Sequence, residues 1–490
     1  METVGQPNHP PKLRLSTKLA YGAGDFGAGL TSNLLAFSFL IFLTNVAGLE
    51  PLAAGTVLLI GKIWDAVNDP LVGILSDRTR TRWGRRYPWI VLTGVPFGLT
   101  FLFNWLVPGS DLINQVALFM SRIVPGFTTQ TALFCYYVIV SITFQIFFTT
   151  TNLPYSTLTA EMTEDYDERT ELTSFRLSFS LAGAVLILAI GLVVSTLVTD
   201  AQRQYQILGA LGGGISIVTI YWCVLGTFHH AQQQSAYRGR TLNDSQASED
   251  ESFAKQLKVV FSNRPFLFVV GIYLFSWLAL QITATIIPFY VTFWMGADDY
   301  FLAALLVQGT AIGMMFICNL LAKRVGKKGL YFLGSGFWIL VQIALFFLQP
   351  GQLNALYLLC ILASFGVATA YVVPWSILPD VIELNELKTG QRSEGAFYAF
   401  MTLLQKIGLA AGIFLVSLAL EMSGFIKETA QQSAVVQQPE SALLAIRFFM
   451  GPVPLVLLLG GIVLAYFYPI TKASHAETLL KLAEQRKQTK

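Results

Sequence analysis

The stretch Ile60-Gly-Lys-Ile-Trp-Asp-Ala-Val-Asn-Asp-Pro-Leu-Val-Gly-Ile-Leu-Ser-Asp-Arg-Thr-Arg-Thr-Arg-Trp-Gly-Arg-Arg86 begins inside an apolar segment and ends in a cluster of arginines. Within it, Lys62, Asp65 and Asp69 are spaced three and four residues apart, so all three project from one helical face. For a helix over 52–76, Asp65 lies about 16 Å from the arginine end, near the middle of a hydrocarbon core about 30 Å thick. An ionised side chain at that depth costs about 3 kcal/mol even on a lenient scale. These charges are therefore expected to face protein or water rather than lipid.

The amino-acid composition indicates that the whole chain, and not only this stretch, lies in a membrane. Of 490 residues, 54% are hydrophobic and only 12% are charged, which is too apolar for a soluble protein of this length. Apolar runs long enough to span a bilayer recur with short breaks. The sequence therefore predicts an all-α polytopic membrane protein with twelve transmembrane helices, over 17–46, 52–76, 88–107, 131–161, 174–198, 206–228, 264–294, 300–322, 329–349, 354–380, 395–421 and 442–469.

The distribution of basic residues predicts the orientation. Lysines and arginines gather before the first run, after the second and eighth runs, and in the tail, which are alternate connections. By the positive-inside rule both termini are cytoplasmic, in a multi-pass protein of the plasma (inner) membrane. The formal net charge of +3 is then an orientation signal, and we expect a lipid-bilayer environment, no nucleic-acid partner and a monomer. The first ten residues are polar and the first apolar run is too long for a cleavable signal peptide.

Histidine and cysteine usage argues against redox or metal-dependent enzymes. The four histidines lie outside the predicted spans, whereas haem or copper chemistry within a membrane usually needs ligands inside them. The four cysteines fall inside predicted helices at unrelated spacings and are interpreted as packing residues. We expect no enzymatic activity and no cofactor other than Na+ or H+ as a coupling ion.

An internal repeat divides the chain into halves. Pro154-Tyr-Ser-Thr-Leu158 recurs as Pro374-Trp-Ser-Ile-Leu378, and an acid follows each copy. A polar segment over 229–263 separates six predicted helices from six more. The prediction is an N-terminal half over 1–228, a cytoplasmic linker over 229–263, a C-terminal half over 264–470 and a cytoplasmic tail over 471–490, with the halves as parallel repeats.

Polar residues on two other helices are candidates for an internal cavity. On the fourth helix, Gln145, Thr149, Asn152 and Ser156 form a stripe at spacings of four, three and four, which favours a water-filled cavity over plain packing. Asp25 on the first helix either looks inward or caps the helix near its end. Arg176, at the start of the fifth helix, either extends toward the interface or contacts a solute; both alternatives stay open.

Paired carboxylates on the second helix suit a small hard cation or a proton. Together with Asn68 and Thr149, Asp65 and Asp69 provide oxygen ligands that soft metals do not prefer. The alternative is a structural ion pair with Lys62 or with Lys406 of the eleventh helix, but a buried ion pair is weak evidence for stability.

Lys62 and Lys406 are the predicted coupling residues. A lone buried lysine loses its proton or finds an acid, and the two aspartates are the natural acids. A cation bound at the aspartates would free or attract Lys406, and so change how the halves fit together.

Two levels of family resemblance follow from these motifs. The arrangement Gly73-x-x-x-Asp77-Arg78, followed by Gly84-Arg-Arg86, resembles the loop between helices two and three of the major facilitator superfamily, where it latches helix ends in one access state. Positive-inside anchoring also accounts for these arginines, so both functions are expected. The predicted gate residues are Asp77, Arg78, Arg85, Arg86, Asp380 and Arg392.

The second resemblance spans nearly the whole chain. Trp64-Asp-Ala-Val-Asn-Asp-Pro70, Arg82-Trp-Gly-Arg-Arg86 and Gly390-x-Arg392-x-Glu394-Gly395 are similar to the signature of the glycoside-pentoside-hexuronide:cation symporters, the melibiose permease group. The resemblance implies a major facilitator fold. It also implies that Asp65 and Asp69 bind the cation, aided by Thr149, and that Lys406 occupies the lysine position of helix eleven.

The solute-binding positions depart from that group. Where it carries sugar-binding aspartates on helices one and four, this chain has Gly29 and Asn152, and where it carries tryptophans on helices four and ten, this chain has Ser156 and Tyr371. The cation half of the machinery is therefore expected here, and the galactoside half is not. The predicted solute-binding residues are Asp25, Asn152, Arg176, Tyr371 and Trp375.

The sequence predicts a cation-coupled (Na+ or H+) secondary active symporter of a sugar or glycoside that works by alternating access. One alternative is a Na+-dependent transporter of lysophospholipid or another amphipathic solute, since Phe147-Phe148 before Pro154-Tyr-Ser is similar to such transporters in the same family. Another is a membrane sensor or scaffold that has lost transport, but such a protein is expected to lose its buried charges, and they are present here.

Overall fold

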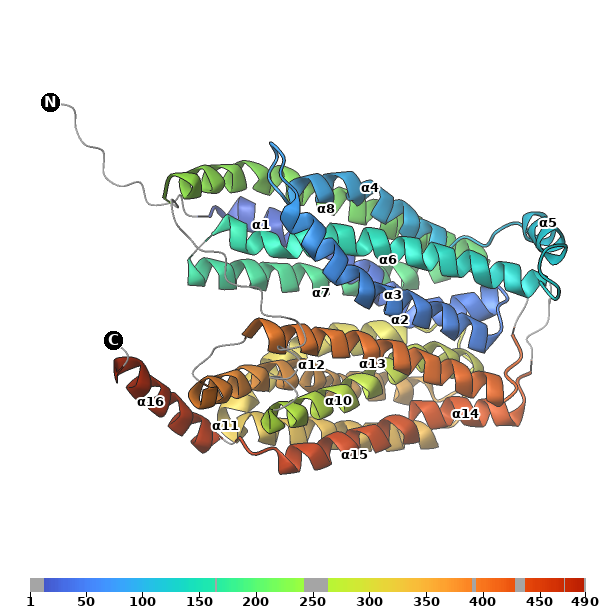
Figure 1. The fold of residues 1–490 in the computed structure, drawn as a ribbon. Helices are drawn as coiled ribbons and strands as arrows, with labels where there is room; N and C mark the ends of the chain where they lie inside the picture. Colours follow the sequence, from blue (N-terminus) through green and yellow to red (C-terminus); the bar gives the residue numbers. More distant parts are fainter. Residues whose placement is uncertain are drawn as a thin grey trace. The chain divides into compact units, whose positions relative to one another are not determined.

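The computed structural model describes residues 13–163, 165–241, 263–389, 394–427, 437–470 and 472–488, and these residues form helices joined by turns (Figure 1). The helices are α1 (Leu15–Ala23), α2 (Phe26–Ile41), the π-helical turn η1 (Phe42–Val46), α3 (Pro51–Arg78), α4 (Tyr87–Asn104), α5 (Ser110–Ser121), α6 (Thr129–Met162), α7 (Tyr166–Leu197), α8 (Ala201–Thr241), α10 (Arg264–Phe289), the π-helical turn η2 (Tyr290–Trp294), α11 (Phe301–Phe347), α12 (Leu353–Thr389), α13 (Glu394–Met422), α14 (Glu440–Met450), α15 (Pro452–Phe467) and α16 (Lys472–Gln488).

The number of membrane-length segments agrees with the prediction. Among the described residues, ten helices are long and apolar enough to cross a membrane. One of them, α11, contains two arms, because Gly326 interrupts it with the non-helical angles φ 76° and ψ 166°. The charged helix α3 is not among the ten, since its lysine and aspartates reduce its apolar character. Counting both arms of α11 and adding α3 gives twelve membrane-length segments in the described parts of the chain.

The chain forms two compact units. The first comprises Met1–Leu35 and Trp64–Ser248, and the second comprises Ala36–Ile63 and Glu249–Lys490. The segment from Ala36 to Ile63 therefore packs with the C-terminal part of the chain, although it lies early in the sequence.

Within the first unit, α4 packs against α6 and α8, and α1 packs against α7 and α8. The contact between α4 and α8 depends on glycine. A Cβ atom at Gly98 would lie 2.5 Å from the carbonyl oxygen of Gly213, and one at Gly213 would lie 2.3 Å from the carbonyl oxygen of Gly98. Small residues at both positions let the two backbones touch, as is common between membrane helices.

Within the second unit, α11 packs on α12, and α10 packs on α13 and α15. Hydrogen bonds attach the early segment to these helices. The hydroxyl of Tyr300 donates to Ser38 Oγ at 2.7 Å, the backbone N–H of Leu52 donates to Glu421 Oε2 at 3.2 Å, and Lys427 donates to the carbonyl of Gly48 at 2.8 Å. Glu421 thereby satisfies a donor at the N-terminus of α3, where a negative charge is favourable.

Two backbone details match between the parts of the chain that the sequence pairs as repeats. The first helix of each half ends in a five-residue π-helical turn, η1 or η2. In the first copy the N–H of Ala47 bonds the carbonyl of Phe42 at 2.9 Å, and in the second the N–H of Met295 bonds that of Tyr290 at 3.0 Å. Similar unusual hydrogen bonds at corresponding places indicate one duplicated six-helix pattern.

Several helix bounds differ from the predicted ones. The short helix α5, in the expected connection between the third and fourth spans, and α16, in the expected tail, were not predicted. Helix α8 continues to Thr241, beyond the expected end of the first half at residue 228. The last predicted span consists of α14 and α15, because Gly451 leaves helical geometry and Pro452 starts the next helix.

Candidate functional site

Two carboxylates of α3 converge on one hydroxyl of α6. Thr149 Oγ1 lies 3.1 Å from Asp65 Oδ1 and 3.2 Å from Asp69 Oδ1. Asp65 and Thr149 are buried, with 3% and 2% of their surface exposed, and Asp69 is half-buried. A hydroxyl carries a single proton, so it can donate to only one of the two carboxylates at a time. The cluster is an arrangement that favours a positive charge between the two acids.

Two amide side chains add to this cluster. Asn68 Nδ2 donates to the backbone carbonyl of Gln145 at 3.4 Å, and both residues are buried. Among the residues that the structure describes, the buried Oε1 atom of Gln145 has no hydrogen-bond partner. An unsatisfied buried acceptor costs about 1–3 kcal/mol, so this oxygen is available to a water or an ion. Gln145 belongs to the polar stripe that the sequence predicts on the fourth helix, one turn before Thr149, although it was not among the predicted cation ligands.

The predicted coupling lysines lie on two different helices. Lys62 precedes Asp65 by three residues on α3, and Lys406 lies on α13; both side chains are half-buried. Both residues belong to the second unit, whereas Asp65 and Asp69 belong to the first. The role of the two lysines in coupling stays a prediction.

Two predicted solute-binding residues, Asp25 and Arg176, form an ion pair. Asp25 lies at the break between α1 and α2, and its Oδ2 atom is 3.2 Å from Arg176 Nε on α7. Arg176 Cζ also lies 6.0 Å from the ring of Tyr155, whose hydroxyl donates to the carbonyl of Tyr21 at 2.7 Å. Asp25 therefore faces another helix. To bind a solute, the pair would have to share its donors and acceptors with solute hydroxyls.

Asn152 keeps a buried acceptor on α6. Its Nδ2 group donates to the carbonyl of Phe148 at 2.9 Å, one turn earlier on the same helix. Within the described part of the chain its buried Oδ1 atom has no partner. Like Gln145, Asn152 therefore presents an oxygen that a solute hydroxyl or a water could satisfy.

An aromatic cluster in the second unit contains the other two predicted solute residues. Tyr371 lies 5.5 Å from Trp277 between ring centroids, and Trp375 lies 5.8 Å from Tyr273. Tyr273 and Trp277 lie on α10 and are 5.6 Å apart. The two pairs between α10 and α12 meet edge to face, at interplanar angles of 80° and 74°, so they form a packed aromatic cluster with polar ring edges.

The contribution of α10 to this cluster was not predicted from the sequence. In the described structure, the buried polar atoms Trp277 Nε1, Gln281 Oε1 and Thr285 Oγ1 have no hydrogen-bond partner. These residues are four apart, so they form one stripe along α10. Trp277-x-x-x-Gln281-x-x-x-Thr285 was a readable signal, of the same kind as the stripe noted on the fourth predicted helix.

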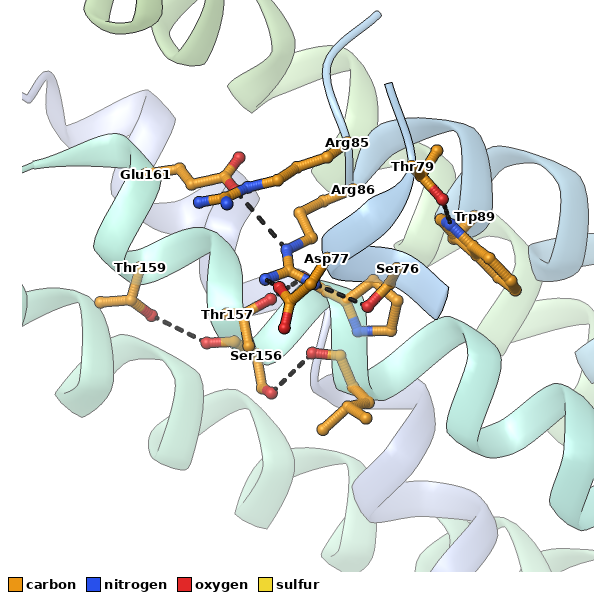
Figure 2. A network of polar contacts seen from close by, with 12 residues as sticks. Ser76, Asp77, Thr79, Arg85, Arg86, Trp89, Ser156, Thr157, Thr159 and Glu161 are labelled. Atoms are coloured by element: carbon orange, nitrogen blue, oxygen red, sulfur yellow. Dashed lines mark hydrogen bonds and ion pairs between the residues drawn. The ribbon is translucent and has the colours of Figure 1, made fainter. Parts of the chain in front are cut away.

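A network at the end of α3 contains three of the six predicted gate residues, Asp77, Arg85 and Arg86, and Figure 2 shows it from close by. The buried guanidinium of Arg86 has partners on three sides. Its Nη1 atom lies 2.6 Å from Ser76 Oγ, its Nη2 atom pairs with Asp77, and its Nε atom lies 3.5 Å from Glu161 Oε1. Arg85 Nε reaches the same carboxylate at 2.5 Å. The loop after α3 is thus tied to both α3 and α6; Arg78, the last residue of α3, is exposed.

The corresponding acid of the second half has a lysine partner. Lys327 Nζ lies 2.7 and 2.8 Å from the two carboxylate oxygens of Asp380 and 2.7 Å from the carbonyl oxygen of Ser376. The other predicted gate residue of this half, Arg392, lies outside the described residues.

The two acid–base pairs follow the same backbone turn. Gly84-Arg85-Arg86 and Gly326-Lys327-Lys328 each begin with a glycine at positive φ, 88° and 76°. Residues other than glycine rarely adopt this conformation. In both halves a glycine at positive φ therefore directly precedes the basic residue that meets an acid.

Comparison with known proteins agrees with this architecture. A family model described as MFS/sugar transport protein matches residues 20–472. An uncharacterized symporter of Synechocystis sp. is 43% identical, over 95% of this chain and 96% of that protein. The sodium-dependent lysophosphatidylcholine symporter 1 of Mus musculus is 26% identical, over 99% of this chain and 91% of that protein.

A solved structure shares the fold. The inward-open xylose transporter XylE from E. coli superposes with a TM-score of 0.61 over 95% of this chain and 99% of that chain, at 14% identity. The apolar helices, the repeated turns and these matches together show that the chain belongs to the MFS/sugar transport protein family of multi-pass membrane transporters, and the relatives named above are symporters.

Proposed function

We propose that this chain is a cation-coupled symporter of the melibiose permease group, in which Na+ or H+ binds at Asp65, Asp69 and Thr149. The convergence of two carboxylates on one buried hydroxyl carries the proposal. Carboxylate, hydroxyl and amide oxygens are hard ligands, which prefer Na+ or a proton to soft metals. Asn68, on the same helix as the two acids, bonds the Gln145 carbonyl and so links α3 to α6 beside this cluster.

Cation binding supplies the driving force for the solute. A positive charge between Asp65 and Asp69 relieves their mutual repulsion, and Lys62 and Lys406 transmit this change between access states. A ligand shifts such an equilibrium only by its differential affinity for the two states. The membrane potential contributes about 2.3 kcal/mol per elementary charge per 100 mV, so one cation can drive a neutral solute uphill.

The solute that we favour is a sugar or glycoside. The rings of Trp277, Tyr371 and Trp375 provide faces on which a sugar ring can stack, and the orphan polar atoms on α10 and Asn152 can bond hydroxyls. A pocket of apolar faces with a few polar groups is typical of small-molecule sites. In the first unit, Asp25 and Arg176 are the other solute-binding residues that we propose, and the proposed gate residues are Asp77, Arg78, Arg85, Arg86, Asp380 and Arg392.

A lysophospholipid is the second candidate. It is favoured by the full-length similarity to the mouse lysophosphatidylcholine symporter, at 26% identity. A lipid differs from a sugar in needing an apolar groove for its tail, so the two classes can be separated by competition.

The test is uptake into proteoliposomes with imposed Na+ or H+ gradients. Radiolabelled glycosides and lysophosphatidylcholine are offered to the wild type, to Asp65→Asn and to the control Asp111→Asn, whose exposed carboxylate lies on α5. We expect uphill accumulation of a glycoside by the wild type and the control, and none by Asp65→Asn. Undiminished uphill uptake by Asp65→Asn would overturn the coupling assignment.

The same panel decides between the remaining candidates. Gradient-driven uptake of lysophosphatidylcholine without glycoside uptake would establish that the transported solute is a lysophospholipid. No gradient effect on any solute would favour a non-transporting sensor. We propose a monomer in the plasma (inner) membrane with both termini cytoplasmic, which protease protection of the tail in sealed vesicles tests.

A further inference from the structure

The short helix α16 is fastened to α12 by a histidine and two acids. His475 Nε2 lies 2.7 Å from Glu383 Oε2 and 3.4 Å from Asp380 Oδ1. Asp380 is buried, and Glu383 and His475 are half-buried. The three side chains come from two helices almost 100 residues apart in sequence, and α16 packs against α12 where they meet.

One imidazole and two carboxylates form a familiar ligand set for a divalent transition metal. One ligand atom from each residue lies within 4.8 Å of the other two. In a tetrahedral zinc site, bonds of about 2.0–2.2 Å hold the ligand atoms about 3.3 Å apart. The distance of 3.4 Å between His475 Nε2 and Asp380 Oδ1 is close to this value, whereas Glu383 Oε2, at 2.7 Å from the imidazole, would have to move away from it. We propose that Asp380, Glu383 and His475 form a zinc-type metal site that clamps α16 onto α12.

The surroundings of the three ligands support a metal ion. Lys327 bonds both oxygens of Asp380 and the carbonyl of Ser376. A carboxylate has about four lone-pair sites, so Oδ2 can keep the lysine while Oδ1 takes a metal. Hydrogen bonds of this kind orient metal-binding carboxylates from outside the ligand shell.

Charge and access also fit a dication. Lys327 balances one of the two carboxylates, and His475 is neutral unless protonated. A metal ion would supply the positive charge that faces the second carboxylate. A cavity of about 580 Å³ lined by Lys327, Asp380, Tyr468 and His475 adjoins the cluster. It leaves room for the water that completes the coordination of an open zinc site.

The consequence is a metal-dependent attachment of the C-terminal helix. Asp380 also holds Lys327, so an ion at this site would connect α16 to the acid–base pair that repeats the Arg86 network in the second half. The site uses none of the proposed cation ligands on α3, so zinc binding and solute coupling can be tested separately.

The test uses the full-length protein in detergent, with any affinity tag removed and metals stripped by a chelator. Zn2+ binding is measured by equilibrium dialysis, and Co2+ serves as a coloured probe whose visible absorption reports four-coordinate geometry. We expect one Zn2+ per chain in the wild type. His475→Ala and Glu383→Gln should each weaken binding at least tenfold. Glu477→Gln is the matched control, because this exposed residue of α16 pairs with Lys481.

A gain-of-affinity variant guards against misfolding. Glu383→His creates two imidazoles and one carboxylate, which is a strong zinc set, and it should bind Zn2+ at least as tightly as the wild type. Hydrogen exchange of α16 should slow when Zn2+ is added to the wild type and not when it is added to His475→Ala. Absence of stoichiometric binding, or equal binding by wild type and His475→Ala, would overturn the proposal and leave a hydrogen-bonded cluster only.

Discussion

Buried and half-buried carboxylates in this protein are of two kinds, distinguished by their partners. Asp380 holds the ammonium of Lys327 at 2.7 and 2.8 Å, which compensates its charge within one half. Asp65 and Asp69 instead meet at the hydroxyl of Thr149, which satisfies one carboxylate at a time. The two carboxylates of α3 therefore share one hydroxyl of α6.

We predict that Thr149→Ala weakens coupling-cation binding about tenfold, because a hydrogen bond to a charged group contributes about 1.5–3 kcal/mol. The measurement is the cation concentration that gives half-maximal uptake. Thr149→Ser should restore the wild-type value, since it keeps the hydroxyl. The control is Thr150→Ala, whose buried hydroxyl bonds only carbonyls of its own helix among the described contacts. If Thr149→Ala behaved like this control, the hydroxyl would have no part in the site.

Neighbouring arginines of the α3–α4 loop should differ sharply in their contribution to stability. Arg86 is 6% exposed and contacts Ser76, Asp77 and Glu161, whereas the Arg85 side chain is 49% exposed. Loss of Arg86 removes the hydrogen-bond donor to Ser76 and the ion pairs with Asp77 and Glu161.

We predict that Arg86→Ala lowers the free energy of unfolding by about 1–3 kcal/mol, and Arg85→Ala by less than about 1 kcal/mol. Thermal unfolding in detergent, followed by the midpoint temperature, measures the difference. Equal midpoints for the two variants would show that burial of Arg86 contributes nothing to the network.

At the scale of helices, glycines set how closely neighbouring elements approach. The backbones of α4 and α8 touch at Gly98 and Gly213, where a Cβ atom would meet a carbonyl oxygen. Backbone cannot move aside as a flexible side chain can, so the helices would have to separate. Gly214, the next residue, is exposed and has no atom within 4 Å of its added Cβ.

We predict that Gly213→Ala lowers the free energy of unfolding by about 1–3 kcal/mol through overpacking. Gly214→Ala should be neutral or slightly stabilising, because alanine is the better helix former. Comparing thermal midpoints of the two single variants tests this directly, and an unchanged midpoint for Gly213→Ala would contradict the close approach.

A glycine at positive φ precedes the basic residues of both predicted gates. The turns at Gly84 and Gly326 both need positive φ, and each places a basic residue against an acid at the end of a neighbouring helix. The two basic loops, Gly84-Arg-Arg86 and Gly326-Lys-Lys328, resemble each other only weakly in sequence, because lysines replace arginines in the second. Glycine position, rather than the kind of base, was the better guide to the shared turn.

At the scale of the whole molecule, the segment 36–63 lies in a different unit from the helices that surround it in the sequence. It belongs by sequence to the first half, yet it packs in the second unit, with Ser38 on Tyr300 and Gly55 on Ser417. The proposed transport cycle therefore depends on how closely this segment packs on its neighbours in the second unit.

We predict that Gly55→Leu lowers the maximal uptake rate several-fold, because an added Cβ would lie 2.2 Å from Ser417 Oγ and larger atoms would keep the segment from seating. Gly309→Leu is the control, since no atom lies within 4 Å of an added Cβ there. Uptake is normalised to protein inserted in the membrane. Normal uptake by Gly55→Leu would show that this contact is not needed for transport.

The sequence by itself determined where the membrane-length helices lie and which polar residues share a helical face. The bilayer imposes a minimum length on every spanning helix, so the twelve segments could be read from hydropathy. The spacing of Asp65 and Asp69 placed both on one face, because helix geometry is local. The polar stripe likewise put Thr149 on a neighbouring helix as a candidate.

Side-chain partners were decided by the tertiary structure. The pairing of Asp25 with Arg176, of Asp380 with Lys327, and the joining of α10 aromatics to Tyr371 each bring together residues 50 or more positions apart. No local periodicity encodes such distances, since they depend on helix rotation and on the close approach that small residues permit. The cluster around His475 has the same origin: it exists only because α16 folds back onto α12.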